Sequence, residues 1–339
     1  PIHTFSIAEP ANWVALGSFL LVSTVVSRLV LRARREAEEA RARSQAPFDT
    51  GDMVELVASG ERGLAFLREA AVEPRSRTLP LAGVRLRAPV HRPRKNVFCV
   101  GWNYLEHFAE GEKWRQTKQE LPEHPVFFSK AASAVSGPFD PIPYDPKVSQ
   151  EVDWAVELGV VIGAPGKNLS EAEAMGHVFG YTVVNDVSAR DIQKQHGGQW
   201  HKGKSLDGFC PMGPWIATAD EVDPSDLRVI TRVNGVTKQD SSTRHLYFKI
   251  PRLIAELSLG LTLEPGDVIS TGTPSGVGFG RTPPEFMKAG DVMETIGGRV
   301  SRTIDREQAV DQFPAISPNF AYTVFVPSPA IKVQFFVVV

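Results

Sequence analysis

Two neighbouring stretches, EVDWAVELGVVIG at residues 151–163 and FGYTVVNDVSARDIQ at residues 179–193, decide the fold of this chain. The first alternates polar and apolar residues and then becomes apolar, as a strand does when it passes from a polar cleft into a core. In such a strand Asp153, Ala155 and Glu157 fall on one face. The pattern therefore predicts that Glu157 points into a cleft.

The second stretch predicts another short apolar strand at residues 181–184, which delivers Asn185 and Asp186 at its end, before a helix that begins near Ser188. A buried carboxylate is costly unless it meets a cation or several donors, and hard divalent ions such as Mg²⁺ prefer oxygen ligands. Spacing alone favours simple hydrogen bonding of Glu157 and Asp186 to backbone or arginine. The metal interpretation depends on the motifs along the rest of the chain.

Composition narrows the class of protein. The chain has 339 residues, of which 42% are hydrophobic, enough for a sizeable core. A formal net charge of −2 gives no case for nucleic-acid binding. Cys99 and Cys210 lie far apart among apolar residues, which indicates reduced core positions and a cytoplasmic protein.

The N-terminal region, residues 1–47, contains WVALGSFLLVSTVVSRLVL at residues 13–31, which is long enough to span a bilayer if Arg28 lies at its edge. Arginines follow this run, so the positive-inside rule would place the rest of the chain on the cytoplasmic side. The run and the charged linker after it resemble the last membrane span and linker of potassium-responsive sensor histidine kinases, although no kinase motif follows. A surface helix that packs in an oligomer is the equal alternative to a membrane tether.

Three further regions follow. Residues 48–90 form a small N-terminal region with two short amphipathic helices separated near Gly60. Residues 91–300 form the predicted catalytic domain. Residues 301–339 form an appended tail, to which we assign no role, although its alternation predicts edge strands.

The first chemical motif is NVFCVGWNYLEHFAEG at residues 96–111, which predicts a strand, a glycine turn and a helix. His107 and Glu110 lie three residues apart and so share one face of that helix. A carboxylate beside an imidazole fixes its tautomer and raises its basicity, as a general base requires. Most such pairs on surface helices are only solvated side chains, so this interpretation needs support from other motifs.

That support comes from the order of the motifs. HPVFFSKAASAVSGPFDPI, the two stretches quoted first, GGQWHKGKSLDGFCPMGPWI and LEPGDVISTGTPSGVGFG follow one another between residues 124 and 280. In this order the chain resembles the fumarylacetoacetate hydrolase family of 2-oxo acid enzymes over about residues 80–291. The resemblance implies an α+β fold with a mixed, rolled β-sheet core, and a homodimer.

The resemblance also implies a divalent metal, Mg²⁺ or Mn²⁺, held by an acidic triad. Glu157 and Asp186 match two of its three carboxylates, whereas the third position is Ala155, whose methyl group cannot ligate a metal. The remaining pair is therefore expected to hold a metal weakly, mainly when substrate is present. Asp153 lies one strand repeat away and would need a bridging water.

The other site residues are assigned by the same resemblance. It implies a His-x-x-Glu catalytic dyad, a lysine that stabilises negative charge on the substrate, an arginine and a glutamine that contact its polar groups, and a threonine turn that binds a substrate oxygen. In this sequence these residues are His107, Glu110, Lys204, Arg190, Gln193 and Thr273.

The function that follows is metal-dependent C–C bond hydrolysis of a small 2-oxo acid or 2-oxo-diacid through a metal-bound enolate. Decarboxylation, tautomerisation or isomerisation of the same substrate class is the alternative, because it uses the same enolate without an attacking water. A different class of function is a pseudoenzyme or binding protein in which Ala155 has disabled the metal site.

Overall fold

The computed structural model describes residues 53–65, 86–112, 120–298, 319–321 and 330–338, and for the last two ranges the backbone alone. The chain divides into two compact units, Pro1–Asp52 and Met53–Val339, and every described residue lies in the second. Residues 13–31, the candidate membrane span, lie outside the described part. Within that part no helix is long and apolar enough to cross a bilayer.

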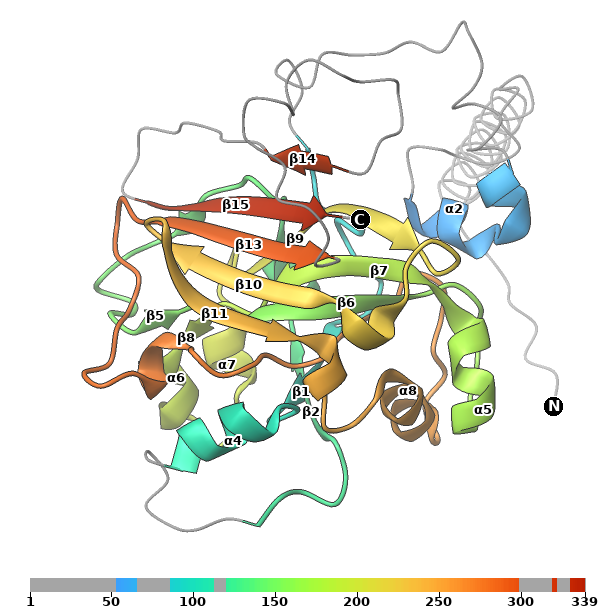
Figure 1. Ribbon diagram of the computed structural model, residues 1–339, viewed down its shortest axis with the longest axis horizontal. Coiled ribbons are helices and arrows are strands. Elements are labelled where there is room, and N and C mark those ends of the chain that lie inside the picture. The colour runs from blue at the N-terminus through green and yellow to red at the C-terminus, as the bar shows by residue number, and fades with distance from the viewer. Residues whose placement is uncertain (1–52, 66–85, 113–119, 299–318, 322–329, 339) are drawn as a thin grey trace, which may run out of the picture. The chain divides into compact units, whose positions relative to one another are not determined.

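The centre of the described unit is a seven-stranded mixed sheet with the order β2-β1-β12-β6-β7-β9-β3 (Figure 1). Most neighbours pair antiparallel, but β1 with β12 and β3 with β9 pair parallel. Its strands are β1 (Val97–Gly101), β2 (Val126–Lys130), β3 (Val135–Ser136), β6 (Val156–Ile162), β7 (Val178–Asn185), β9 (Cys210–Thr218) and β12 (Val268–Ser270). Every residue of β6 is buried, which agrees with its apolar sequence.

A second sheet packs against β6 and β7. Its order is β11-β10-β13-β15-β14, and a short strand, β4, also pairs with β15. These strands are β4 (Ile142–Pro143), β10 (Arg228–Val233), β11 (Val236–Ser242), β13 (Val292–Gly298), β14 (Asn319–Ala321) and β15 (Ala330–Val338). One buried cluster joins Val156 and Val183 of the first sheet to Val229 and Met293 of the second.

Short helices pack around the two sheets (Figure 1). They are α2 (Met53–Ala58), α4 (Leu105–Glu112), α5 (Glu171–Ala174), α6 (Arg190–Gln195), α7 (His201–Lys204) and α8 (Ile250–Ser258). Pro251 lies in the first turn of α8, where its missing N–H costs nothing. Leu253, Ile254 and Leu257 form one buried face of α8 and pack into the same cluster as Leu158 of β6.

The predicted α+β fold with a mixed, curled sheet is confirmed. In the N-terminal region α2 ends at a turn around Gly60, after which residues 61–65 are helical. In the tail, the backbone of β15 pairs with both β13 and β14, so this strand lies inside the second sheet and not at its edge.

Candidate active site

Strands β6 and β7 lie side by side and carry two buried carboxylates to the same end of the sheet. Glu157 on β6 accepts hydrogen bonds on Oε2 from the Ser270 hydroxyl at 2.6 Å and from the Gly272 backbone N–H at 2.9 Å. Burial, and then the charge of Asp186, raise the pKa of Glu157 to about 7, although these donors oppose the rise.

Asp186 follows the end of β7 and lies between two buried lysines. Lys130 Nζ donates to Asp186 Oδ1 at 2.7 Å and also to the Val187 carbonyl, and Lys204 Nζ donates to Asp186 Oδ2. Burial opposes ionisation of Asp186, but the two ammonium groups outweigh it and lower its pKa to about 2. Burial lowers the pKa of Lys204, against the opposing effect of Asp186. Glu157 and Asp186, together with Lys130 and Lys204, therefore form a buried cluster of two acids and two cations.

The expected metal triad is incomplete, because its third position is Ala155. The side chain of Ala155 is buried, and its backbone carbonyl accepts a hydrogen bond from Asp186 N–H. Both oxygens of Asp186 already accept hydrogen bonds from ammonium groups. Within the described residues no group of three or more His, Cys, Asp or Glu side chains is placed to hold a metal ion. The residues present do not fit a resident three-carboxylate metal ion, so no chemical step is assigned to one.

The strand that precedes Glu157 is interrupted, and this corrects the predicted alternation. Strand β5 (Val152–Asp153) pairs with β8 (Ser188–Ala189), and β6 begins only at Val156. Across the gap, Ala155 N–H donates to the Asn185 side chain and Val156 N–H donates to the Gln239 side chain. The helix expected near Ser188 begins at Arg190, because β8 takes residues 188 and 189.

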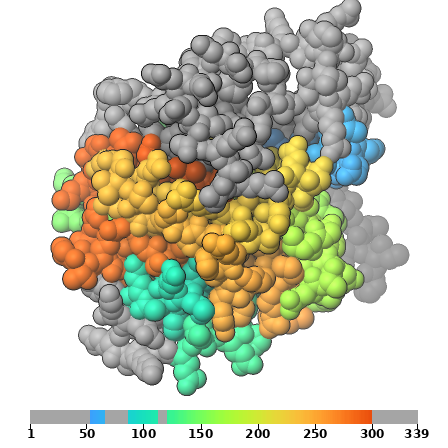
Figure 2. Space-filling model, in the orientation of Figure 1, coloured from blue at the N-terminus to red at the C-terminus, as the bar shows by residue number. Residues whose placement is uncertain are grey.

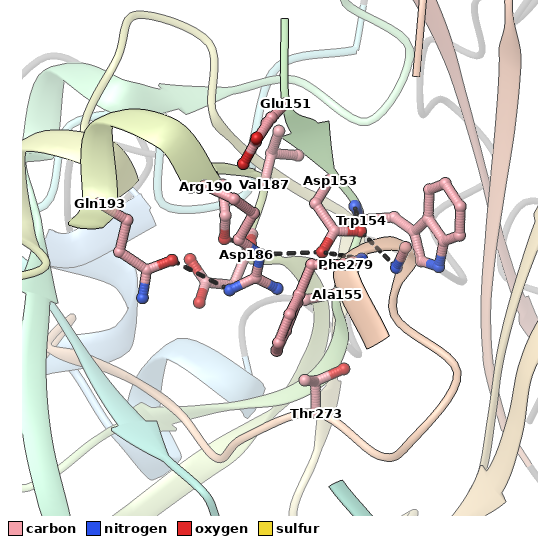
Figure 3. A network of polar contacts seen from close by, with 12 residues as sticks. Glu151, Asp153, Trp154, Ala155, Asp186, Val187, Arg190, Gln193, Thr273 and Phe279 are labelled. Atoms are coloured by element: carbon pink, nitrogen blue, oxygen red, sulfur yellow. Dashed lines mark hydrogen bonds and ion pairs between the residues drawn. The ribbon is translucent and has the colours of Figure 1, made fainter. Parts of the chain in front are cut away.

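Asp153, considered from the sequence as a water-bridged ligand, serves another purpose. It is fully buried, and its carboxylate accepts from Arg190 Nε at 2.8 Å and from the backbone N–H groups of Trp154, Gly278 and Phe279. Figure 3 shows Asp153 at the centre of this network, between Arg190 on one side and Trp154 on the other. Because both of its oxygens accept hydrogen bonds from these donors, the Asp153 carboxylate has a structural role.

The predicted dyad is formed on α4. His107 Nδ1 lies 3.1 Å from Glu110 Oε2, and Glu110 Oε1 accepts from the Gly276 backbone N–H at 3.0 Å. Burial lowers the pKa of His107, Glu110 raises it, and the charges of Arg190 and Lys204 lower it again. In Figure 2 the teal surface around α4 adjoins orange surface from later in the chain. Ser275 also donates a hydrogen bond to Glu106 of α4. The dyad is thus held from outside its own helix.

The three predicted substrate-binding residues have defined partners. Arg190 NH1 donates to Gln193 Oε1 at 3.0 Å, and the guanidinium carbon lies 4.3 Å from the centre of the Phe279 ring. Thr273 Oγ1 accepts from Gln239 Nε2 at 2.8 Å and directly follows Gly272, which donates to Glu157. The structure therefore brings Arg190 and Gln193 together, and it places Thr273 against Gln239, one residue after the glycine that binds Glu157.

Three contributors to this region received no site role from the sequence. Lys130 ends an apolar strand, and a lysine in that place signals a buried partner, which is Asp186. Gln239 on β11 binds Val156 N–H, Thr273 and the Pro274 carbonyl, but nothing in an alternating edge strand indicates such a role. Phe279 lies against both Arg190 and His107, whose ring centre is 6.0 Å away.

The site as a whole combines one imidazole with a carboxylate partner and several buried cations. His107 is close enough to Arg190 and Lys204 for both charges to influence its pKa. Cations in a dry site bind an anionic substrate and stabilise negative charge that develops on it. An imidazole in the same place can accept or return a proton. The arrangement is suited to forming and discharging an enolate.

Comparison with curated proteins finds relatives that are named oxaloacetate tautomerases. Oxaloacetate tautomerase YisK of Bacillus subtilis is 43% identical over 252 residues, covering 72% of this chain and 82% of that protein. The mitochondrial oxaloacetate tautomerase FAHD2A of Bos taurus is 48% identical over 244 residues, covering 71% and 75%.

Solved structures of similar sequence also match the fold of this chain. A fumarylacetoacetate hydrolase from Exiguobacterium antarcticum has a TM-score of 0.59 at 41% identity, covering 73% of this chain and 84% of that chain. A 2-hydroxyhepta-2,4-diene-1,7-dioate isomerase from Mycobacterium marinum has a TM-score of 0.56 at 34% identity, covering 78% and 81%.

Two family models match the sequence. One, a domain of unknown function named DUF4118, matches residues 1–43, outside the described part. The other, the fumarylacetoacetate (FAA) hydrolase C-terminal domain, matches residues 96–304, more than half of the chain. Together with the relatives above, this match shows that the chain belongs to the fumarylacetoacetate hydrolase family.

Proposed function

We propose that the chain is a keto–enol tautomerase or isomerase of a small 2-oxo-diacid of the oxaloacetate type. Relatives named oxaloacetate tautomerases, and a solved relative named a dienedioate isomerase, support this class. The sequence interpretation placed C–C bond hydrolysis first and this class second. The relatives' names favour the second.

The observation that carries the proposal is the placement of His107. Its Nδ1 lies beside the Glu110 carboxylate, so that Nδ1 carries the proton and Nε2 keeps its lone pair. Burial and the nearby cations lower its pKa, so the imidazole is neutral at neutral pH and able to act as a base. It needs no attacking water to move a proton on a bound 2-oxo acid.

The reaction moves one proton and conserves every atom. In the keto form, His107 Nε2 removes a proton from C3, and the electron pair of that C–H bond forms the C2–C3 double bond while negative charge develops on the C2 oxygen. The Lys204 ammonium stabilises this oxyanion and gives it a proton, which yields the enol, a neutral Lys204 amine and a protonated His107. Loss of that proton from His107 to solvent and uptake of one by Lys204 restore both groups for the next turnover. The reverse sequence converts enol to keto.

Binding falls to the remaining predicted residues. Arg190 and Gln193 are hydrogen-bonded to each other and present a guanidinium and an amide to the substrate's polar groups. Thr273, whose hydroxyl oxygen accepts from Gln239, offers its hydroxyl hydrogen to a substrate oxygen. The 2-oxo-diacid is thus oriented by its two ends while the proton moves between them.

None of the proton transfers proposed above uses the predicted metal ion. The sequence interpretation named Mg²⁺ or Mn²⁺ on Glu157 and Asp186, and the incomplete ligand set at Ala155 does not support a resident ion. Introducing the missing carboxylate is the direct way to examine this prediction, as described below for Ala155→Glu.

We also propose a cytoplasmic homodimer. The dimer rests on the family resemblance, and both cysteines of the chain are free and buried, as in reducing compartments. Sedimentation velocity at several protein concentrations checks the dimer, and a single species with the mass of one chain would contradict it.

The experiment is to follow the disappearance of enol-oxaloacetate by its ultraviolet absorbance in a stopped-flow instrument, with product analysis by NMR. The proposal predicts acceleration over the buffer rate with oxaloacetate as the product. Release of CO₂ would indicate a decarboxylase, and cleavage of an acylpyruvate would restore the hydrolase interpretation. Binding of oxalate without any turnover would favour the binding-protein alternative.

A further inference from the structure

The carboxylate of Asp153 joins two parts of the candidate active site that come from distant segments of the chain. It accepts from Arg190 Nε at 2.8 Å, from Trp154 N–H at 2.8 Å, from Gly278 N–H at 2.6 Å and from Phe279 N–H at 3.2 Å. Its exposed fraction is 0%. An anion so deeply buried persists because these donors compensate it, so its position is strongly determined.

On one side, Asp153 fixes the orientation of Arg190. The ion pair holds the Nε edge of the guanidinium, Gln193 accepts from NH1, and the ring of Phe279 lies against its face at 4.3 Å. Figure 3 shows this sequence of contacts from Gln193 through Arg190 to Asp153. A planar guanidinium held on an edge and a face has one orientation toward a ligand.

On the other side, Asp153 fixes the loop at residues 276–280. A Cβ added at Gly278 would lie 2.7 Å from Asp153 Oδ1, so the loop backbone approaches the carboxylate more closely than any side chain would allow. The same loop holds the dyad, because Gly276 N–H donates to Glu110 Oε1 and a Cβ at Gly280 would lie 2.3 Å from Glu110 Cγ.

We propose that Asp153 is a positioning residue that sets the distance between the proposed substrate-binding guanidinium of Arg190 and the proposed general base His107. Phe279 completes the connection, since its backbone N–H binds Asp153 while its ring lies against both Arg190 and His107. Asp153 itself touches no substrate. This inference rests on the proposed function for its kinetic readout only.

The first test is Asp153→Asn, which keeps the shape but turns one acceptor into a donor that faces donors. The misplaced guanidinium and base are expected to raise KM for oxaloacetate and lower kcat, reducing kcat/KM about 10- to 100-fold. Combining it with Arg190→Lys should cost much less than the product of the two single effects, because both changes break one connection.

A second readout does not need turnover. The groups that influence His107 are Glu110 on its own helix and Arg190 and Lys204 on two others. Asp153→Asn leaves the Arg190 charge uncompensated, so the pKa of His107, measured by NMR titration of its imidazole, should fall. If the wild type proves inactive, the proposed function fails, but this readout still tests the role of Asp153.

Two further variants keep the result interpretable. Asp267→Asn is the matched control, because Asp267 is also buried and accepts from Lys95 Nζ and Glu264 N–H at 2.8 Å each, two partners that are not residues of the candidate site. It should leave KM and the His107 titration unchanged. If Asp153→Asn fails to fold, Phe279→Leu is the substitute, because it keeps the backbone donor to Asp153 and removes the ring. Like Asp153→Asn, it should raise KM for oxaloacetate. Wild-type KM and His107 titration in a folded Asp153→Asn, or in Phe279→Leu, would overturn the proposal.

Discussion

At the scale of single residues, the most consequential side chain is that of Lys204, whose ammonium is buried and bonded to Asp186. Lys204→Met removes the cation assigned to the developing oxyanion. We expect kcat/KM for tautomerisation to fall about 100-fold or more, and the unfolding free energy to fall by about 3–5 kcal/mol, because Asp186 loses a buried partner. Lys194→Met, at a lysine that is 56% exposed, is the control and should change neither. A Lys204→Met variant with wild-type turnover would remove Lys204 from the mechanism.

The pH dependence of the reaction is a second residue-scale prediction. Because the neutral imidazole is the base, activity falls as the pH drops through the pKa of His107. Burial lowers that pKa, so the acid limb of kcat/KM should lie below the ordinary histidine value. Glu110→Gln removes the carboxylate that raises the pKa, so the acid limb should move to still lower pH while the maximal rate falls. A limb that moves to higher pH in Glu110→Gln contradicts the assignment.

Ala155 gives a third prediction at this scale. Ala155→Glu supplies the carboxylate that the family resemblance places beside Glu157 and Asp186. We expect Mn²⁺ to bind the variant at least 10- to 100-fold more tightly than the wild type, as measured by electron paramagnetic resonance of free Mn²⁺. Equal Mn²⁺ affinity in both proteins would show that position 155 is not the missing ligand position.

At the scale of secondary-structure elements, the sheets support the site while α8 supports the sheets. Leu253 of α8 is fully buried in the cluster that includes Leu158 of β6. Leu253→Ala should lower the unfolding free energy by about 2–5 kcal/mol in urea denaturation. Because Leu253 packs in a cluster with Leu158, Val160 and Ile162 of β6 that contains none of the proposed catalytic or substrate-binding residues, KM for the 2-oxo acid should stay within twofold. A large rise in KM together with unchanged stability would contradict this division of roles.

The elements also show what the sequence could and could not predict. Alternation and apolar runs located β6, β7 and α4, because these elements bury continuous faces. They did not reveal the break between Asp153 and Val156, since side chains from Asn185 and Gln239 replace the ladder hydrogen bonds there. Asn185 is adjacent to Asp186, but Gln239 is more than 80 residues from Val156 along the chain, and sequence spacing carries no sign of such a contact.

The same limit applies within the site. The His107 and Glu110 pair is local on one helix, so its geometry followed from spacing. The partners of Asp186 and Asp153 are distant in sequence, and their charges are balanced only once the fold brings Lys130 and Arg190 to them. The family resemblance identified the candidate site residues, whereas only the structure shows which of their charges are paired.

At the scale of the whole molecule, the two sheets of the described part meet at a buried cluster next to β6 and β7, and both sheets include strands from the family match at residues 96–304. Segments between β1 and the loop at residues 276–280 contribute the two carboxylates, the two lysines and the His107–Glu110 dyad of the candidate site. The proposed reaction exchanges a proton at C3 of a 2-oxo-diacid and leaves the carbon skeleton intact.

The measurement that tests this claim most directly is hydrogen–deuterium exchange at C3 of oxaloacetate in D₂O, followed by proton NMR with and without the protein. We expect exchange faster than the buffer rate, no loss of carbon, and a return to near the buffer rate in His107→Asn. Exchange at the buffer rate with the wild-type protein, or exchange that survives in His107→Asn, would contradict it.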